Sequence, residues 1–319
     1  SFDKNITASA YYWKGESFYR TKQYQKAIES YMEYILDPGA IGKSELGDAN
    51  YNVAYSYFKL KDYTNSNLWF RKFVTFKPQA NPKKINDALN RIGDGYFVSR
   101  DFLNALDYYG QSFKMNLMNS DYALFQKALA NGVLKKYSDK ISDLKMFISM
   151  YSSTTSTYKE RAKFELAQTY YVDNQNEMAM ASYKNFIEEY QNSMFVNTSL
   201  SKIALIYYAK KDDDNALAYF DKLIKRDRKS PEANEAISTV KAIYTAKGNV
   251  QAMEEYMASI GAAIPQAAID SISFDIGKKH YMEQDCKSVV VDFEKYIQKF
   301  PDGILYLKQI FTKPNVIIN

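Results

Sequence analysis

Short side chains recur along this chain at a nearly constant interval, and this repeat constrains the fold more than any other feature. The successive intervals are 39, 39, 35, 39, 37, 36 and 37 residues, so eight units fill almost all of the 319 residues. Such a period indicates a tandem array of small supersecondary units. The recurring residues are Gly15, Ala54, Gly93, Ala128, Ala167, Ala204, Val240 and Gly277.

Each unit contains two segments with the periodicity of an amphipathic helix. In the second unit, Tyr51, Ala54 and Phe58 recur at helical spacing, and Phe70 and Phe73 do so after a short polar break. The chain has only 12 Gly and 7 Pro, too few for a β-sandwich or barrel with its frequent turns. We therefore predict an all-α fold of antiparallel helix-turn-helix repeats, in which the short side chains let the two helices of a hairpin approach closely.

A hairpin this short cannot bury its own apolar faces, so successive hairpins are expected to stack into a solenoid. We predict that the array covers residues 8–303, with repeats starting near residues 8, 47, 86, 121, 160, 197, 233 and 270. Residues 304–319 are predicted to form a partial helix or the start of a truncated further repeat. Truncation is favoured, because the outer face of Ile304–Phe311 would be apolar and terminal repeats need a polar outer face.

The pattern resembles the tetratricopeptide repeat, whose motif has small residues at positions 8 and 20, Tyr at 11, an aromatic at 24 and Pro at 32. The second repeat matches throughout, with Ala54, Tyr57, Ser66, Phe70 and Pro78. The resemblance covers roughly residues 8–301 and implies a right-handed superhelical solenoid of about eight repeats. It also implies a protein-binding function.

Several repeats depart from this motif, and the third and the fifth to seventh lack its Pro. The fourth has Asn131 at position 11 and Lys140 at position 20, and the last has His280 and Val289 there. The Phe300-Pro301 ending is similar to a bacterial envelope subset of the family, which includes outer-membrane assembly lipoproteins and periplasmic cell-division coordinators. That likeness implies the bacterial periplasm or the periplasmic face of the outer membrane.

In the family that the chain resembles, the first helix of each repeat lines a concave groove, mainly through positions 2, 5, 9 and 12. Seven of the eight residues at position 12 are aromatic, with Gly132 as the exception, and five of the eight at position 5 are aromatic. We predict that these rings bind a partner; the alternative is that they pack one hairpin on the next. The predicted partner-binding residues are Tyr12, Tyr19, Tyr51, Phe58, Phe97, Phe125, Phe164, Tyr171, Tyr208, Tyr244, Phe274 and Tyr281.

The resulting functional hypothesis is a non-enzymatic scaffold that binds a peptide or an amphipathic helix of another protein in an aromatic-lined groove. Aromatic rows also stack on sugar rings, so a glycan- or peptidoglycan-binding module of the bacterial envelope is the alternative. Lys241 and Lys278 stand at position 9 of the last two repeats, which suggests an acidic-to-basic gradient along the groove. The acidic residues at positions 2 and 9 of the first three repeats are Glu16, Asp48, Asp87 and Asp94. They suggest an acidic end to the groove.

The sequence predicts neither a catalytic site nor a metal or cofactor site. A single Cys286 and a single His280 exclude a Cys/His metal cluster. Gly93-Asp94-Gly95 falls inside a predicted helix rather than between a strand and a helix, so it is no phosphate loop. Asp212–Asp214 lacks the glycine and the distal glutamate of a calcium loop and is predicted to be a solvated turn.

Charge and hydropathy exclude two further classes of partner. The 42 basic and 37 acidic residues are interspersed, whereas a nucleic-acid-binding surface needs a sustained basic stripe. No apolar run approaches the roughly 18 residues of a membrane span, so none is predicted. The oligomeric state is left open.

Overall fold

The computed structural model describes residues 4–75, 81–117, 119–153, 155–262 and 264–301. Within these residues the chain forms sixteen α-helices and one short 3₁₀-helix, with no strand. The prediction of an all-α fold of helical repeats is therefore confirmed. Pro78 and the segment 304–319, on which two of the sequence expectations fall, lie outside the described residues.

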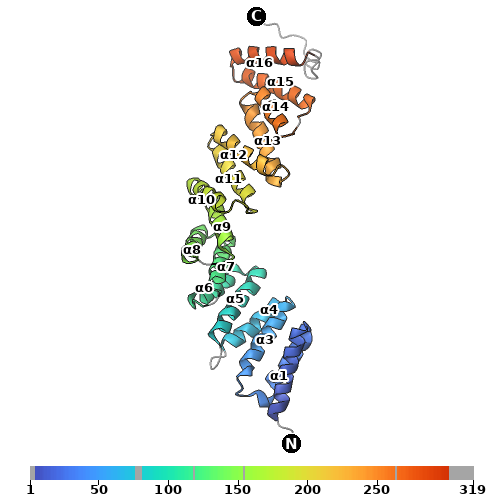
Figure 1. The fold of residues 1–319 in the computed structure, drawn as a ribbon, viewed down its shortest axis with the longest axis vertical. Coiled ribbons are helices and arrows are strands. Elements are labelled where there is room, and N and C mark those ends of the chain that lie inside the picture. The colour runs from blue at the N-terminus through green and yellow to red at the C-terminus, as the bar shows by residue number, and fades with distance from the viewer. Residues whose placement is uncertain (1–3, 76–80, 118, 154, 263, 302–319) are drawn as a thin grey trace. The chain divides into compact units, whose positions relative to one another are not determined.

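The chain divides into two compact units, residues 1–182 and 183–319. In the first unit, consecutive helices pair and then stack on the next pair in chain order (Figure 1). Its helices are α1 (Lys4–Arg20), α2 (Tyr24–Leu36), η1 (Pro38–Ala40), α3 (Glu45–Lys59), α4 (Tyr63–Thr75), α5 (Pro82–Val98), α6 (Phe102–Lys114), α7 (Ser120–Val133), α8 (Tyr137–Met150) and α9 (Lys159–Val172).

The division between the units falls inside α10 (Asn176–Glu189). The second unit continues the same alternation of first and second helices. It contains α11 (Val196–Ala209), α12 (Asp213–Arg226), α13 (Pro231–Ala246), α14 (Val250–Ser259), α15 (Gln266–Met282) and α16 (Cys286–Lys299).

The turns inside the hairpins share one backbone geometry. In each turn one residue adopts the left-handed conformation, such as Lys61 at φ 62° and Lys211 at φ 62°, which ends the first helix. An acidic residue often follows and caps the second helix. Asp212 accepts a hydrogen bond from the backbone nitrogen of Asn215 at 3.2 Å, and Asp101 does the same for Asn104. The acidic run at Asp212 thus contains a helix cap.

Close approach of the two helices in a hairpin depends on the short residue at position 8. A Cβ atom added to Gly15 would lie 2.7 Å from a ring carbon of Tyr31, and one added to Gly93 would lie 2.7 Å from the ring of Tyr109. Real Cβ atoms do not come this close, so only glycine fits there with the tyrosine in place. The expected close approach at these positions is present.

Candidate protein-binding surface

The seven aromatic residues at position 12 all retain contact with solvent. Six are half-buried, and Tyr281 is 67% exposed. Complete burial would have excluded them from binding a partner, and none shows it. They are Tyr19, Phe58, Phe97, Tyr171, Tyr208, Tyr244 and Tyr281.

In the first three repeats, one side of each position-12 ring packs on the hairpin turn. The ring meets the aromatic residue that opens the second helix, five positions later. The centroid distances are 5.6 Å for Tyr19–Tyr24, 5.5 Å for Phe58–Tyr63 and 5.2 Å for Phe97–Phe102, all edge-on. These contacts hold the rings in place while part of each ring stays open to solvent. The same rings can therefore pack within the array and also bind a partner.

The position-5 rings lie deeper than those at position 12. Tyr12, Phe125 and Phe164 are buried, with at most 9% of their surface exposed. Tyr12 meets Tyr34 in the second helix of its own hairpin at 5.3 Å, and Phe125 meets Phe147 at 6.0 Å in the same way. The three buried rings belong to the core and offer little area to a partner.

Tyr51 and Phe274, the other two position-5 rings, are half-buried but also held within their hairpins. Tyr51 packs on Phe73 at 5.0 Å, and Phe274 packs on Tyr296 at 5.6 Å. The surface available to a partner is therefore formed mainly by position 12.

The acidic side chains of the first repeats are engaged inside the protein. Glu16 accepts a hydrogen bond from the Tyr31 hydroxyl at 2.8 Å and another from the Asn52 amide. Asp48 pairs with the Lys84 ammonium at 2.6 Å. An acidic end of the groove was expected from these residues, but hairpin-to-hairpin contacts occupy the carboxylates.

Asp87 and Asp94 form a connected polar cluster around Arg91. The Tyr109 hydroxyl donates to Oδ1 of Asp94 at 2.8 Å, and the Tyr122 hydroxyl donates to the same oxygen. Arg91 pairs with the other oxygen, Oδ2. Burial raises the pKa of Asp94, and the Arg91 charge and the tyrosine hydroxyls oppose that shift. The cluster links three hairpins of the first unit.

The fourth repeat replaces the usual packing with charged groups, which accounts for its departures from the motif. The Lys140 ammonium reaches Glu165 in the next repeat at 2.7 Å, and its aliphatic stem occupies the space beside Gly132. A Cβ on Gly132 would lie 2.9 Å from that stem. Asn131 donates to Asp143 at 2.8 Å. Lysine at position 20 therefore explains why position 12 carries no ring here.

Two lysines accompany the exposed tyrosines of the second unit. Lys241 precedes Tyr244 by three positions on α13, and Lys278 precedes Tyr281 by three on α15, so each pair shares a helix face. Within the described residues, neither lysine has an ion pair or a side-chain hydrogen bond. Their charges are available to a ligand.

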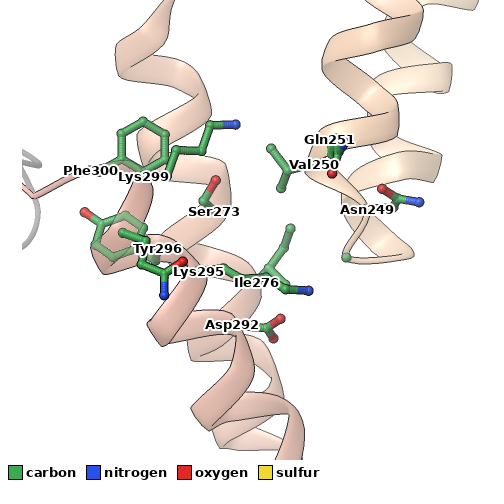
Figure 2. A pocket seen from close by; sticks show the side chains of 12 residues that line it. Asn249, Val250, Gln251, Ser273, Ile276, Asp292, Lys295, Tyr296, Lys299 and Phe300 are labelled. Carbon is green, nitrogen blue, oxygen red and sulfur yellow. The ribbon is translucent and has the colours of Figure 1, made fainter.

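The second unit also contains a cavity of about 510 Å³, lined on one side by the α13–α14 turn and on the other by α15 and α16 (Figure 2). Two of its charged side chains are already paired. Asp292 accepts from Nδ1 of His280 at 2.6 Å, and Lys299 pairs with Glu254. His280 is thus a half-buried, hydrogen-bonded residue, and Cys286 is exposed at the first turn of α16.

The described part of the chain has neither a cluster of metal ligands nor a membrane-spanning helix. No group of three or more His, Cys, Asp or Glu side chains there could hold a metal ion. Among the same residues, no helix is long and apolar enough to cross a membrane.

Family models identify the repeats. Three models of the tetratricopeptide repeat match residues 6–41, residues 47–79, and residues 161–193 with 198–230. The sequence at these four places therefore matches the tetratricopeptide repeat. Such repeats generally mediate protein–protein interaction, and none of the matching models describes an enzyme.

Solved structures agree on the fold. The apo form of RapI is 11% identical with a TM-score of 0.50, over 95% of this chain and 99% of that chain. PilW, a type IV pilus biogenesis factor, is 15% identical over 72% of this chain and 98% of its own, with a TM-score of 0.47. Pseudomonas aeruginosa PilF is 14% identical over 73% and 97%, with a TM-score of 0.46. At 11% identity, the match to RapI supports the helical-repeat fold alone.

A sequence search of curated proteins found no match to the chain.

Proposed function

We propose that this protein is a non-catalytic scaffold that binds a peptide segment of another protein on the position-12 face of its first helices. One observation carries the proposal: every aromatic side chain at this position is partly open to solvent, whereas three of the five at position 5 are buried. Tyrosine suits such a site, because its ring offers apolar area and its hydroxyl remains hydrated or bonds the ligand.

The second unit offers the clearest binding surface. Tyr208, Tyr244 and Tyr281 lie at equivalent positions of three successive first helices, and Lys241 and Lys278 stand beside the last two. Rings supply contact area, and uncompensated ammonium groups attract carboxylates. A peptide with apolar anchors and nearby acidic residues fits this surface best.

A phage-displayed peptide library, selected against the intact chain, tests the proposal. Selected peptides should lose about tenfold or more in affinity for the Tyr208→Ala/Tyr244→Ala variant. Tyr281→Ala provides a second variant in which folding is not at risk, because that ring is largely exposed. The matched control is Tyr219→Ala, which removes a half-buried ring on α12 that stacks on Tyr207 outside the row.

Peptides whose affinity is unchanged in the ring variants would contradict the proposal, as would a selection that yields no peptide. Binding on a glycan array that is lost in the same variants would assign the face to sugars instead. Both outcomes are separable from unfolding by the circular dichroism of each variant.

We further propose a bacterial envelope location for this scaffold. The support is the Phe300-Pro301 ending of the last repeat, which is similar to envelope-associated tetratricopeptide proteins. Fractionation of cells that express the full reading frame should place the protein with periplasmic or outer-membrane markers. Recovery with cytoplasmic markers would overturn this proposal without affecting the binding face.

A further inference from the structure

A second candidate site lies in the first unit and shares no residue with the ring surface of the second unit. A cavity of about 630 Å³ opens between α5, the start of α7 and the link between α8 and α9. Its walls include the rings of Tyr122, Tyr151 and Tyr158, the carboxylate of Asp121 and the guanidinium of Arg91. None of these residues is part of the predicted aromatic rows.

The aromatic walls of the cavity are held in place from behind. Tyr158 stacks on Phe125 at 5.3 Å and meets Tyr122 at 5.8 Å. Tyr151 packs on Phe147 at 4.9 Å, and both Phe125 and Phe147 are fully buried. Because the supporting rings belong to the core, the cavity wall is preorganised before any ligand arrives.

Asp121 brings a carboxylate to the same cavity. Its Oδ2 accepts from the Ser156 hydroxyl at 2.7 Å, and its Oδ1 accepts from the backbone nitrogen of Tyr122 at 2.8 Å. Both partners are neutral, and Asp121 has no ion pair in the described part of the chain. Burial, followed by the Asp121 charge, raises the pKa of both Tyr151 and Tyr158, which places the two rings within the field of this carboxylate.

The remaining charges around the cavity do not favour an anion. Arg91 is the cation of the wall, but Asp94 pairs with it and Asp87 lies 3.5 Å from its Nε. Its guanidinium also lies 5.4 Å from the centroid of Tyr122, so that ring face is already covered. The charged side chains of the lining are thus Arg91, which Asp94 and Asp87 already neutralise, and Asp121, whose carboxylate has only neutral partners. Lys159, next to the lining, donates to the backbone oxygen of Ser152 at 2.6 Å.

We propose that this cavity binds the charged head of a lysine or arginine side chain from a partner polypeptide. Asp121 would serve as the counter-ion, and the rings of Tyr151 and Tyr158 would supply cation–π contacts. A carboxylate beside aromatic rings recognises an ammonium or guanidinium better than a neutral group, because both the charge and the ring quadrupoles attract it.

Small amides of single amino acids test this assignment on the intact chain. Nα-acetyl-lysine methylamide and its arginine counterpart are titrated at low salt and followed by NMR shifts of the protein. Nα-acetyl-norleucine methylamide, which matches the lysine stem without its charge, and the Nα-acetylated glutamate analogue are the comparison ligands. We expect saturable binding of the two cations that is at least about tenfold tighter than that of norleucine, and weaker binding as salt rises.

Variants locate the binding. Asp121→Asn keeps the size of the side chain and removes its charge, and it should weaken binding of the cation by about tenfold. Tyr151→Leu should weaken it as well, while leaving the carboxylate in place. The control is Asp107→Asn, which removes one exposed carboxylate from α6 in the same unit.

Three outcomes would overturn the inference: equal affinity for norleucine, preference for the glutamate analogue, or equal loss in Asp107→Asn and Asp121→Asn. Failure of this test leaves the ring surface of the second unit untouched, because Tyr208, Tyr244 and Tyr281 are not changed in it.

Discussion

The hydroxyl of Tyr51 donates a hydrogen bond to Oδ2 of Asp87 at 2.7 Å, across 36 residues of sequence. The same separation joins Asn52 to Glu16 and Lys84 to Asp48. Each bond connects the first helix of one repeat to the first helix of the next. Stacking in the first unit therefore relies on a series of polar links as well as on apolar packing.

Tyr51→Phe should lower the free energy of unfolding by about 1 kcal/mol, because it removes one hydrogen bond to a carboxylate and keeps the ring. Asp87 retains the Tyr55 hydroxyl and Arg91, so the loss stays small. Urea unfolding followed by circular dichroism measures it. In a double-mutant cycle with Asp87→Asn the two changes should be non-additive; strict additivity would show that the bond contributes nothing.

Gly93→Ala should destabilise the protein by about 1–3 kcal/mol, even though alanine is the better helix former. The added Cβ would lie 2.7 Å from the Tyr109 ring, which is 1% exposed and cannot move aside. Gly110→Ala is the matched control, since nothing lies within 4 Å of the new Cβ in α6. That variant should raise the free energy of unfolding by up to about 1 kcal/mol. Equal effects of the two changes would contradict the close packing.

Stability should fall steeply in alkali, because burial raises the pKa of core tyrosines. For Tyr34 the folded-state pKa is about 12, against about 10 in an unfolded chain. Because the pKa of Tyr34 is higher in the folded state, its contribution to the free energy of unfolding is complete below pH 10. That contribution is lost as the pH rises through 12. Burial also raises the pKa values of Tyr51 and Tyr109, so they act in the same direction.

Absorbance at 295 nm and circular dichroism, recorded together between pH 9 and 13, check this expectation. Part of the tyrosine ionisation should coincide with loss of helix. Tyr34→Phe should reduce the loss of unfolding free energy between pH 10 and 12 by up to about 2–3 kcal/mol. Ionisation of every tyrosine before any helix is lost would refute it.

Lys140→Met should lower the free energy of unfolding by about 2–3 kcal/mol, because Glu165, whose side chain is only 18% exposed, would lose its closer partner and keep only Arg161 at 3.9 Å. Adding Glu165→Gln should restore part of that loss. Lys247→Met, which breaks the exposed pair with Asp214, should hardly change the midpoint of urea unfolding. Similar losses of stability in the two lysine variants would mean that burial does not decide how much these ion pairs contribute to stability.

The helical-repeat fold could be predicted because the information is local. Gly15 and Tyr31, or Gly93 and Tyr109, are sixteen residues apart within one hairpin, and the alternation of short and aromatic residues specifies which faces meet. The same register assigned positions 5 and 12 to one face, but it did not show that Tyr12 and Phe125 are buried while the rings at position 12 stay partly open.

The polar contacts could not be predicted in this way. Helical register assigns Asp87 to a face, but the partner of its carboxylate depends on the offset between neighbouring hairpins. The cavity around Asp121 was missed for a related reason. The cavity depends on the path of the link that carries Ser156 and Tyr158. Its one signal in the sequence is a Ser/Thr-rich stretch with Tyr151 before it and Tyr158 after it.

The shared carboxylates also limit how such a chain can change its repeat number. Asp87 takes hydroxyl donors from the hairpin before its own, and Asp94 takes one from α6 of its own hairpin and one from α7 of the next. Duplication or deletion of a single hairpin by recombination would leave a carboxylate of the new junction without its donors. We therefore expect the hairpins of the first unit to be duplicated or lost together rather than singly.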